Sequence, residues 1–234
     1  MFQTINDELA FSDRPYIYSM RSEKEPERAA YLMKWLRANN INNYTMGLTC
    51  YSDDISADIA AKVYNPWVDR RPVERERSFN SYNLKQGEIS LVLNWASAAQ
   101  KAIKAGHKIV MILESDVLFH DDFLEKLTDA MKQLEGRPWD FLSLSAGANL
   151  RPRRTDGDTS LGWFPAPGYY HTRTTDAMIY KVAMLEKING TIIPFAEVLD
   201  WELNYQLSLH NSVSLWLDPP ILRQGSGSVY PTTL

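Results

Sequence analysis

The chain has 234 residues, of which 44% are hydrophobic and 23% are charged, and its formal net charge is −4. These values are those of an ordinary globular protein that can bury a core, and the weak negative charge argues against a nucleic-acid-binding or membrane-binding surface. Cys50 is the only cysteine, which excludes an intrachain disulfide and a cysteine-rich zinc site.

The sequence shows neither a signal peptide nor a membrane-spanning segment. Met1–Pro15 has no apolar core of signal-peptide length, and no segment approaches the roughly 20 apolar residues of a membrane span. We therefore expect a protein with no transmembrane segment that works in a reducing compartment, the cytoplasm.

Apolar runs typical of strands alternate with segments whose apolar residues recur at helical spacing. In chain order, the sequence predicts strand Pro15–Met20, helix Glu25–Asn39, strand Tyr44–Ser52, helix Asp54–Tyr64, helix Gly87–Ala105, strand Lys108–Glu114, helix Asp121–Leu134, strand Trp139–Ser145, strand Thr175–Tyr180, helix Val182–Asn189, helix Leu199–His210 and strand Val213–Leu217. This alternation over residues 1–234 predicts one α/β domain, a sandwich whose mostly parallel central sheet is flanked by helices.

Three polar or irregular segments lie between or after these elements. They are Asn65–Gln86, Ala146–Thr172 and Pro219–Leu234. The first contains the mixed-sign run Arg70–Arg77, which is typical of a solvated face, although Arg77 is a candidate lid residue over a bound phosphate. The second is a candidate functional loop that carries Arg151, Arg153 and Arg154.

The sharpest motif is Lys108–Asp116, K-I-V-M-I-L-E-S-D, an apolar run that ends in two carboxylates. Such a run predicts a strand buried on both faces, and open α/β sheets bind ligands at the carboxyl ends of their strands. Residues two apart on a strand point the same way, so Glu114 and Asp116 are predicted to grip one divalent cation that holds a diphosphate. The plain structural alternative is a strand end with two solvated acids.

Three segments share their order and separation with one enzyme family. They are G-E-I-S-L-V-L-N-W at Gly87–Trp95, I-L-E-S-D-V at Ile112–Val117 and P-P-I-L-R-Q-G-S-G-S-V at Pro219–Val229. Together with the opening Tyr18–Arg28, they resemble glycosyltransferase family 25, the lipooligosaccharide and collagen galactosyltransferases with the GT-A fold. The likeness runs from Tyr16 to Val229. In two places the chain departs from the family, because Asn94–Trp95 stands where the family has Ser-His and Ser115 replaces the middle Asp of I-L-E-D-D.

The resemblance implies a GT-A-like sandwich that uses a nucleotide-sugar donor, UDP-linked, and a glycan or glycoprotein acceptor, with inversion at the sugar carbon. It also implies Mn²⁺ (or Mg²⁺) as the cofactor and no nucleic-acid partner. Asp116 matches the family's final metal-binding position, and Glu114 and Ser115 belong to the motif that serves the metal and the donor ribose. Similar chains are encoded by large viruses, which would place such a member in the cytoplasm of the host.

The segment after the first predicted strand is a candidate for donor binding. GT-A proteins usually hold the nucleotide base and phosphates there, and this chain offers Tyr18, Ser19 and Arg21. Arg21 could pair with diphosphate oxygens through two parallel hydrogen bonds. Arg28 is better explained as a surface charge on the following helix.

Two further pairs of residues are candidates for donor binding. Gly87 and Glu88 open a predicted helix, and helix N-termini attract anions, although simple helix capping explains the pair equally well. The resemblance implies that Gln224 and Ser226 close over the diphosphate, where backbone N–H groups could donate hydrogen bonds.

The catalytic base is expected on an element other than the metal-binding strand, because it must take the proton of the attacking hydroxyl opposite the leaving diphosphate. Asp200 in L-D-W-E-L resembles a late acidic position of the family and is the preferred base, with Asp176 in T-T-D-A-M as the competitor. Glu202 lies on another face of the same predicted helix. His210, or alternatively His171, is a candidate third metal ligand, although a lone histidine is more often a surface or capping residue.

The sequence thus favours a metal-dependent glycosyltransferase. The alternative is a non-catalytic nucleotide-sugar- or carbohydrate-binding domain of the same fold, which the changes at Asn94–Trp95 and Ser115 make worth testing. A nucleotidyltransferase is the third and least favoured function. Such an enzyme should carry a glycine-rich phosphate loop after the first strand, and Tyr18–Arg28 has no glycine.

Overall fold

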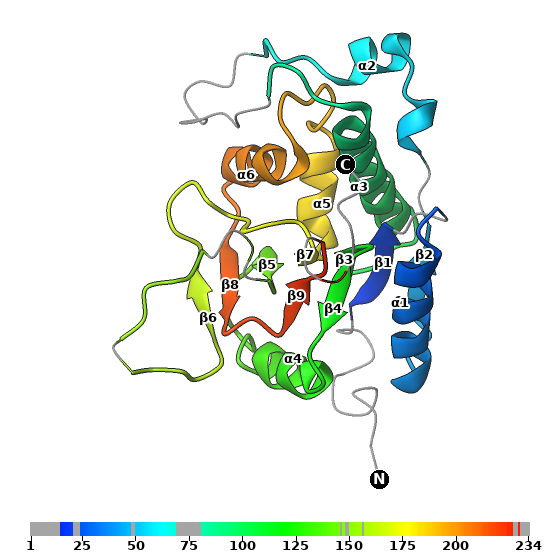
Figure 1. Cartoon of the computed structure of the whole chain (residues 1–234). Coiled ribbons are helices and arrows are strands. Elements are labelled where there is room, and N and C mark those ends of the chain that lie inside the picture. Colours follow the sequence, from blue (N-terminus) through cyan, green and yellow to red (C-terminus); the bar gives the residue numbers. More distant parts are fainter. Residues whose placement is uncertain are drawn as a thin grey trace.

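The computed structural model describes residues 15–20, 24–47, 50–68, 81–145, 147, 150–155, 157–226 and 229. Among these residues, a seven-stranded sheet has the order β2-β1-β3-β7-β5-β8-β6 (Figure 1). Its strands are β1 Tyr16–Met20, β2 Tyr44–Met46, β3 Ile109–Glu114, β5 Phe141–Ser143, β6 Gly162–Pro165, β7 Ala177–Lys181 and β8 Ser214–Asp218.

Most strands of this sheet point in one direction. β1 is parallel to β2 and β3, and β5 is parallel to β8, whereas β7 is antiparallel to both β3 and β5. β6 is antiparallel to β8. Five of the seven strands (β2, β1, β3, β5 and β8) therefore share a direction, and β7 and β6 run against it. The predicted α/β class with a mostly parallel central sheet is confirmed.

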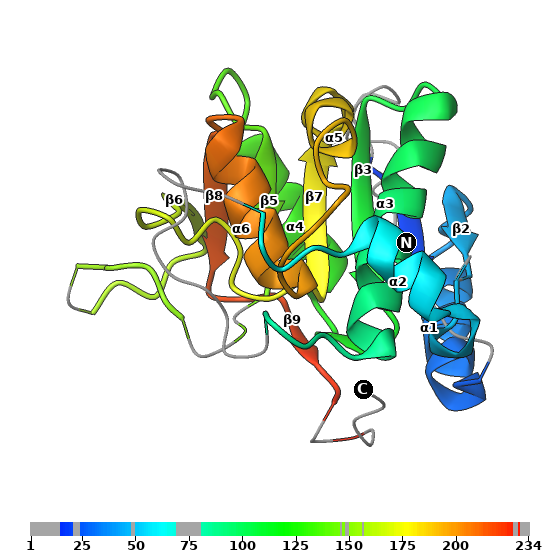
Figure 2. The same ribbon diagram turned by 90° about the horizontal axis from the view of Figure 1, so that it is seen from above.

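Helices cover both faces of the sheet, as Figure 2 shows. The helices are α1 Pro26–Ala38, α2 Ala57–Val63, α3 Gln86–Lys104, α4 Phe123–Lys132, α5 Val182–Asn189 and α6 Leu199–Leu209, with a short 3₁₀ turn at Ser52–Asp54. One hydrophobic core joins α3, α5 and α6 to one face, and a second core joins α1 and α4 to the other. This is the sandwich of helix, sheet and helix that the alternating elements predicted.

Strand β3 illustrates why the apolar run lies at the centre. Val110 and Ile112 point into the core under α3, while Met111 and Leu113 point into the core under α1 and α4. All four side chains are buried, and successive side chains of a strand alternate between faces. A strand buried on both faces needs apolar residues at every position, which is what the sequence supplies.

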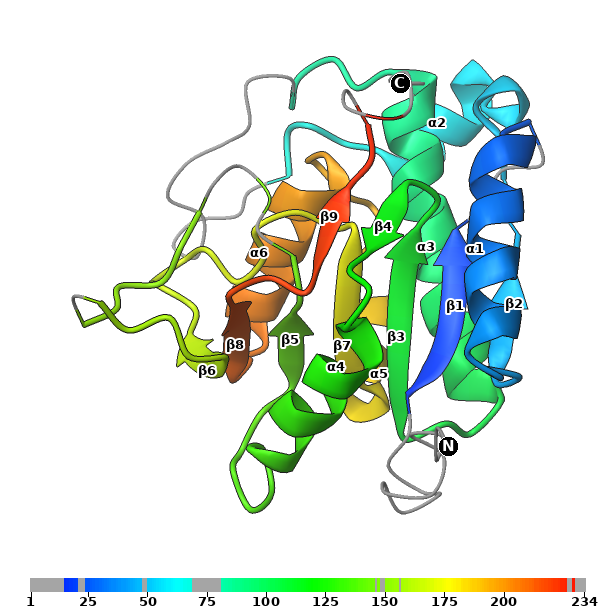
Figure 3. The same cartoon turned by 60° about the horizontal axis from the view of Figure 1, so that its bottom comes forward.

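Three short strands were missed by the sequence analysis. β4 Val117–Phe119 follows β3 after a tight turn and pairs antiparallel with β9 Leu222–Gln224, a segment expected to be irregular (Figure 3). β6 lies inside the loop Ala146–Thr172. Three or four residues are too few for a periodic signal, and each of these strands is stabilised by a partner far away in the sequence.

One predicted strand is shorter than expected. β2 ends at Met46, and Gly47 follows with a φ of 121°, a conformation that a residue with a side chain rarely adopts. The predicted strand Tyr44–Ser52 is therefore wrong beyond Met46 in the residues that the structure describes.

The carboxyl ends of the parallel strands share one edge of the sheet, and β1, β3 and β5 all point towards it in Figure 3. The antiparallel strand β7 begins at this edge, since Leu113 at the end of β3 faces Ala177 at the start of β7. Ligands of open α/β sheets bind at such an edge. Within the described part of the chain, none of the helices combines the length and apolar character that a membrane crossing requires.

Candidate active site at the carboxyl edge of the sheet

Four carboxylates gather at this edge. Glu114 ends β3, Asp116 lies in the turn that follows, Asp176 precedes β7, and Asp200 lies in the first turn of α6. The charges of the other three carboxylates raise the pKa of Glu114 in addition to the larger effect of burial. The structure therefore brings together the paired acids of the motif and both candidate bases.

The pKa of Glu114 is raised by its surroundings. Its Oε1 accepts a hydrogen bond from the Thr175 hydroxyl, and its backbone N–H donates to the carbonyl oxygen of Asp176 over 2.9 Å. Burial, followed by repulsion from Asp116, raises the pKa of Glu114 to about 8. Without a cation beside it, such a carboxyl group favours its protonated form and can donate a hydrogen bond, whereas a bound cation would favour the carboxylate.

Asp116 is the carboxylate best placed to receive a ligand. It is only 2% exposed, and its Oδ2 accepts a hydrogen bond from the backbone N–H of Ser226 over 3.1 Å. Its Oδ1 is buried and has no hydrogen-bond partner among the residues that the structure describes. A buried carboxylate oxygen without a partner is costly, so it marks a place where a cation or donor group would be stabilising.

Asp176 is more completely held by the protein. Its Oδ1 accepts hydrogen bonds from the hydroxyl groups of Ser145, over 2.8 Å, and of Thr174. Burial raises its pKa, these hydrogen bonds lower it, and the charge of Asp116 raises it further. Gly147 approaches so closely that a β-carbon there would lie 1.8 Å from the Thr174 side chain, which explains the glycine in this loop.

Asp200 differs from Asp176 because part of it remains exposed. Its Oδ1 accepts a hydrogen bond from the backbone N–H of Trp201, over 2.9 Å, and its carbonyl oxygen accepts one from the Thr172 hydroxyl. Burial raises the pKa of Asp200, and the backbone hydrogen bond opposes that rise. Asp200 is therefore a carboxylate with raised basicity that an incoming molecule can reach.

Glu202, the neighbour of Asp200 in the acidic pair, has a structural role. It is fully buried, and its Oε2 accepts hydrogen bonds from the backbone N–H groups of Ala196 and Glu197. Its Oε1 accepts a third from Gln206. Glu202 thus anchors the chain that leads into α6.

A small pocket lies between the carboxyl ends of β1 and β2 and the middle of α3. Tyr18 and Ser19 line it, together with Thr45, Asn94 and Lys101. The Ser19 hydroxyl is buried and has no hydrogen-bond partner among the described residues. The structure therefore places Tyr18 and Ser19 beside a small pocket near the acidic edge, and their role in donor binding stays a prediction.

The residues that replace the family's Ser-His pair support the fold. Asn94 holds the backbone of Cys50, accepting from its N–H over 3.1 Å and donating to its carbonyl oxygen over 2.6 Å. Trp95 is fully buried and packs edge-on against Tyr180 at 5.7 Å between ring centroids. Both side chains fix α3 rather than reach the carboxylates.

Ser115 was expected to contact the donor, but the structure places it against α1. Its hydroxyl donates to Glu25 over 2.8 Å and accepts from Arg28 over 3.0 Å. Arg28 also forms an ion pair with Glu25 at 2.8 Å and is only 6% exposed, so its assignment as a surface charge is wrong. Ser115 thus ties the turn after β3 to α1, whereas Glu114 and Asp116 make their contacts elsewhere.

The remaining donor candidates divide into two groups. Glu88 accepts a hydrogen bond from the backbone N–H of Lys85 over 2.6 Å, so it and Gly87 form the first turn of α3 in the way that helix capping predicts. Ser226 does meet Asp116, through its backbone, and Gln224 lies beside it on β9 with an exposed side chain. The backbone N–H groups proposed for the diphosphate are therefore partly used by Asp116.

Neither histidine lies with the acids. His210 caps the far end of α6, about 15 Å of helix from Asp200, and hydrogen-bonds to the Thr191 hydroxyl at 2.9 Å. His171 uses both ring nitrogens on serine hydroxyls. The prediction of His210 as a metal ligand is wrong, because the axis of α6 carries it away from the carboxyl edge. Arg21 and Arg77 lie outside the described residues.

Several residues of the site were missed by the sequence analysis. Thr174 and Thr175, which hold the candidate acids, and Ser145 at the end of β5 carry no pattern of their own. The run Thr174–Asp176 was a usable signal, because hydroxyl residues next to an acid at the start of a predicted strand are suited to hydrogen-bond a neighbouring carboxylate.

The site can be tested for its fit to a divalent cation. Among the described residues, no group of three or more His, Cys, Asp or Glu side chains is arranged to hold a metal. Mg²⁺ and similar ions, however, commonly take one or two carboxylates and complete their coordination with substrate phosphates and water. The unpartnered, buried Oδ1 of Asp116 fits that mode.

No protein-family model matches this chain, and no curated protein is significantly similar to it in sequence.

Proposed function

We propose that this chain is a metal-dependent glycosyltransferase that moves a sugar from a UDP-linked donor to a hydroxyl group of a glycan or glycoprotein, with inversion. The observation that carries the proposal is the unpartnered oxygen of Asp116, buried at the carboxyl edge of the sheet beside three further carboxylates. The resemblance to glycosyltransferase family 25 in the motif Ile112–Val117 points the same way.

The donor would lie along the edge from β1 to β3. Tyr18 and Ser19 line a cavity of only about 10 Å³ beside α3 and could contact one edge of the nucleotide, with the Ser19 hydroxyl available for a hydrogen bond. Asp116 would hold Mn²⁺ or Mg²⁺ together with the diphosphate. The cation would neutralise the negative charge that develops on the departing diphosphate. Glu114, protonated near neutral pH, would hydrogen-bond to a donor hydroxyl or phosphate oxygen.

Asp200 is the better base of the two candidates. Asp176 is 1% exposed and already accepts hydrogen bonds from two hydroxyl groups, so it orients the start of β7. Asp200 is partly exposed, and its raised pKa makes its ionised form a stronger proton acceptor. It would take the proton of the acceptor hydroxyl as that oxygen attacks the sugar carbon.

Aromatic rings beside Asp200 suit a sugar acceptor. Trp201 lies next to it in the chain, and the rings of Tyr169 and Tyr170 lie 6.5 Å and 6.1 Å from the Trp201 ring. The Tyr170 side chain is exposed. Aromatic rings present a flat apolar surface that packs against the apolar face of a sugar ring.

The test is consumption of UDP-sugars with Mn²⁺, measured as release of UDP, for the wild-type protein and two matched variants. Asp116→Asn removes the charge of the proposed ligand, whereas Asp121→Asn removes the same charge from an exposed position. We expect Asp116→Asn to lose at least about 100-fold in turnover and Asp121→Asn to retain the wild-type rate. Equal rates in both variants would remove the proposal.

The rival function is a non-catalytic nucleotide-sugar-binding domain. The observation that favours it is that Glu114 and Asp176 are both held by hydroxyl groups, and that among the described residues of this edge only Asp116 has a buried carboxylate oxygen without a partner. Such a domain would bind UDP-sugars in a calorimetric titration but release no UDP from any of them in the presence of Mn²⁺.

A further inference from the structure

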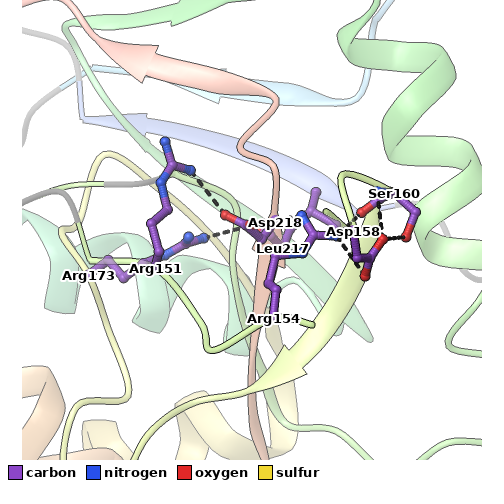
Figure 4. Close-up of polar contacts among 7 residues, drawn as sticks. All are labelled: Arg151, Arg154, Asp158, Ser160, Arg173, Leu217 and Asp218. Carbon is purple, nitrogen blue, oxygen red and sulfur yellow. Dashed lines mark hydrogen bonds and ion pairs between the residues drawn. The ribbon is translucent and has the colours of Figure 1, made fainter. Parts of the chain in front are cut away.

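A cluster of three arginines lies at the end of β8. Arg151 and Arg154 come from the loop between β5 and β6, and Arg173 comes from the segment that precedes β7. Arg151 and Arg154 bind opposite oxygens of the Asp218 carboxylate, at 3.0 Å and 2.8 Å (Figure 4). Segments from two parts of the chain thus bring guanidinium groups to one strand end.

Arg173 is the buried member of this arginine cluster. It is 3% exposed, and its Nη2 donates to the carbonyl oxygens of Ser143, over 3.0 Å, and Leu217, over 2.9 Å. Its guanidinium lies over the Trp216 ring at 5.1 Å. Its Nη1 is buried and has no acceptor among the described residues, and the same is true of Nε of Arg154. Buried N–H groups that lack an acceptor commonly mark a missing partner.

The arginine cluster concentrates three cations beside the acidic edge of the sheet. Asp158 is the only other carboxylate that pairs with the arginine cluster among the described ion pairs, and it lies 3.5 Å from Arg154. The arginine cluster thus pairs with two carboxylates, and the charges of Asp218 and Asp176 both act on Arg173. Asp158 also accepts from Ser160 over 3.0 Å, which braces the loop. Arg151 is about half exposed (49%) and can meet a ligand from solvent.

The position of the arginine cluster separates it from the proposed donor site. In the sheet order, β7 and β5 lie between β3 and β8, which corresponds to roughly 14 Å at about 4.8 Å per strand. The pocket beside Tyr18 lies on the opposite side of β3. Along the edge, the order is therefore nucleotide pocket, Asp116, Asp176 and arginine cluster.

We propose that Arg151, Arg154 and Arg173 bind a carboxylate or phosphate group carried by the acceptor glycan. That the ligand belongs to an acceptor glycan rests on the proposed function. That the ligand is an anion rests on the arginine cluster alone. Guanidinium groups match both anions through paired hydrogen bonds, whereas a neutral hydroxyl group supplies no compensating charge. An acidic sugar of the acceptor that is bound to the arginine cluster would lie on the β8 side of Asp176. The β1 side of the edge would then stay free for the donor.

The anion can be tested without turnover. Glucose 6-phosphate, glucuronic acid and glucose are titrated into metal-free protein by calorimetry or NMR. We expect the two acidic sugars to bind at least about tenfold more tightly than glucose and to lose that advantage in Arg151→Gln. Arg153→Gln removes the same charge from an exposed neighbour and should bind like the wild type. Equal binding of the acidic and neutral sugars, or equal loss in both variants, would overturn the inference.

A second titration separates acceptor from donor. UDP-glucose and UDP-glucuronic acid are bound in the presence of Mn²⁺, and we expect Arg151→Gln to change neither affinity. Selective weakening of UDP-glucuronic acid would assign the anion to the donor sugar and overturn the acceptor assignment. Asp116→Asn should still bind glucose 6-phosphate, so loss of the proposed catalysis and loss of the arginine cluster's ligand are distinguishable.

Discussion

The backbone N–H of Ser226 donates a hydrogen bond to the Asp116 carboxylate over 3.1 Å, although the two residues are 110 positions apart. The N–H of Gly225 binds the Asp116 carbonyl oxygen over 2.7 Å, and β9 pairs with β4 immediately beside them. The segment after β8 therefore positions the carboxylate on which the proposed function depends. Among the residues that the structure describes, only one side-chain oxygen of Asp116 is occupied in this way, which leaves the other for a ligand.

Removing the Ser226 N–H should impair the proposed catalysis. Ser226→Pro has no backbone donor for Asp116, whereas Ser226→Ala keeps it. We expect UDP release with Mn²⁺ to fall about tenfold in Ser226→Pro, the value of one hydrogen bond to a charged group, and to stay near wild type in Ser226→Ala. Circular dichroism checks that both variants fold. Equal activity of the two variants would show that the N–H does not position Asp116.

Asp200 and Glu202 should separate catalysis from stability. Asp200→Asn removes the proposed base, so kcat should fall roughly 100-fold or more while the melting temperature changes little. Glu202→Gln places an amide N–H₂ against backbone donors, which should cost about 1–3 kcal/mol in the free energy of unfolding with a small effect on kcat. The reverse pattern, in which Asp200→Asn unfolds readily and stays active, would contradict the assignment of the base.

The contact between Arg28 and Ser115 predicts a stability effect. Arg28→Met leaves Glu25, whose side chain is only 14% exposed, without its ion pair, and we expect a loss of about 3 kcal/mol in urea denaturation. Arg37→Met removes an exposed charge from the same helix and should change stability by less than about 0.5 kcal/mol. Ser115→Ala should cost about 1 kcal/mol. If Arg28→Met is as stable as Arg37→Met, the pair does not hold the turn after β3.

His171 should make the protein less stable in acid. Burial lowers its pKa to about 4 from the ordinary 6.5, and its ring nitrogens bind Ser214 and Ser208 at 2.7 Å and 2.9 Å. Between pH 6.5 and 4 the unfolded chain binds a proton that the folded chain does not. The contribution of His171 to stability is therefore fully present above pH 6.5 and falls by about 3 kcal/mol on the way to pH 4. The raised pKa of Glu114 acts in the opposite direction, because the folded chain binds that proton more tightly than the unfolded chain.

The measurement is urea denaturation at pH 7 and pH 4.5 for His171→Gln and, as a control, His120→Gln. We expect the change in stability from pH 7 to pH 4.5 to be more favourable in His171→Gln than in the wild type, and to equal the wild-type change in His120→Gln. The same change in His171→Gln and in the wild type would show that His171 does not contribute to the pH dependence.

The sequence predicted the long elements well and the short ones poorly. The helix Val182–Asn189 has the predicted bounds, and the strand Ile109–Glu114 lies within one residue of its predicted start. The helix carries apolar residues at helical spacing, and the strand is a continuous apolar run. β4, β6 and β9 were missed, because three or four residues show no period and their pairing depends on partners such as Val117 and Gln224 that are distant in sequence.

The site was predicted in part for the same reason. The spacing of Glu114 and Asp116 predicted that both lie at the carboxyl edge of the sheet. In the structure, Asp176 and Asp200 lie at the same edge. The role of Ser115 could not be derived from its neighbours in the chain, because its partners are Glu25 and Arg28 on another element. His210 was misplaced because spacing along a helix does not say which end faces the sheet edge.

The amino-acid pattern alone predicted the class of fold and the strand that ends in two acids, because the spacing of apolar residues is a local property of the chain. The tertiary structure decided the rest. It gave Glu114 a raised pKa through burial, and it left one oxygen of Asp116 without a partner. It also gathered Arg151, Arg154 and Arg173 at one strand end. Charge interactions and hydrogen bonds between distant segments depend on how the sheet is ordered, and no local pattern specifies that order.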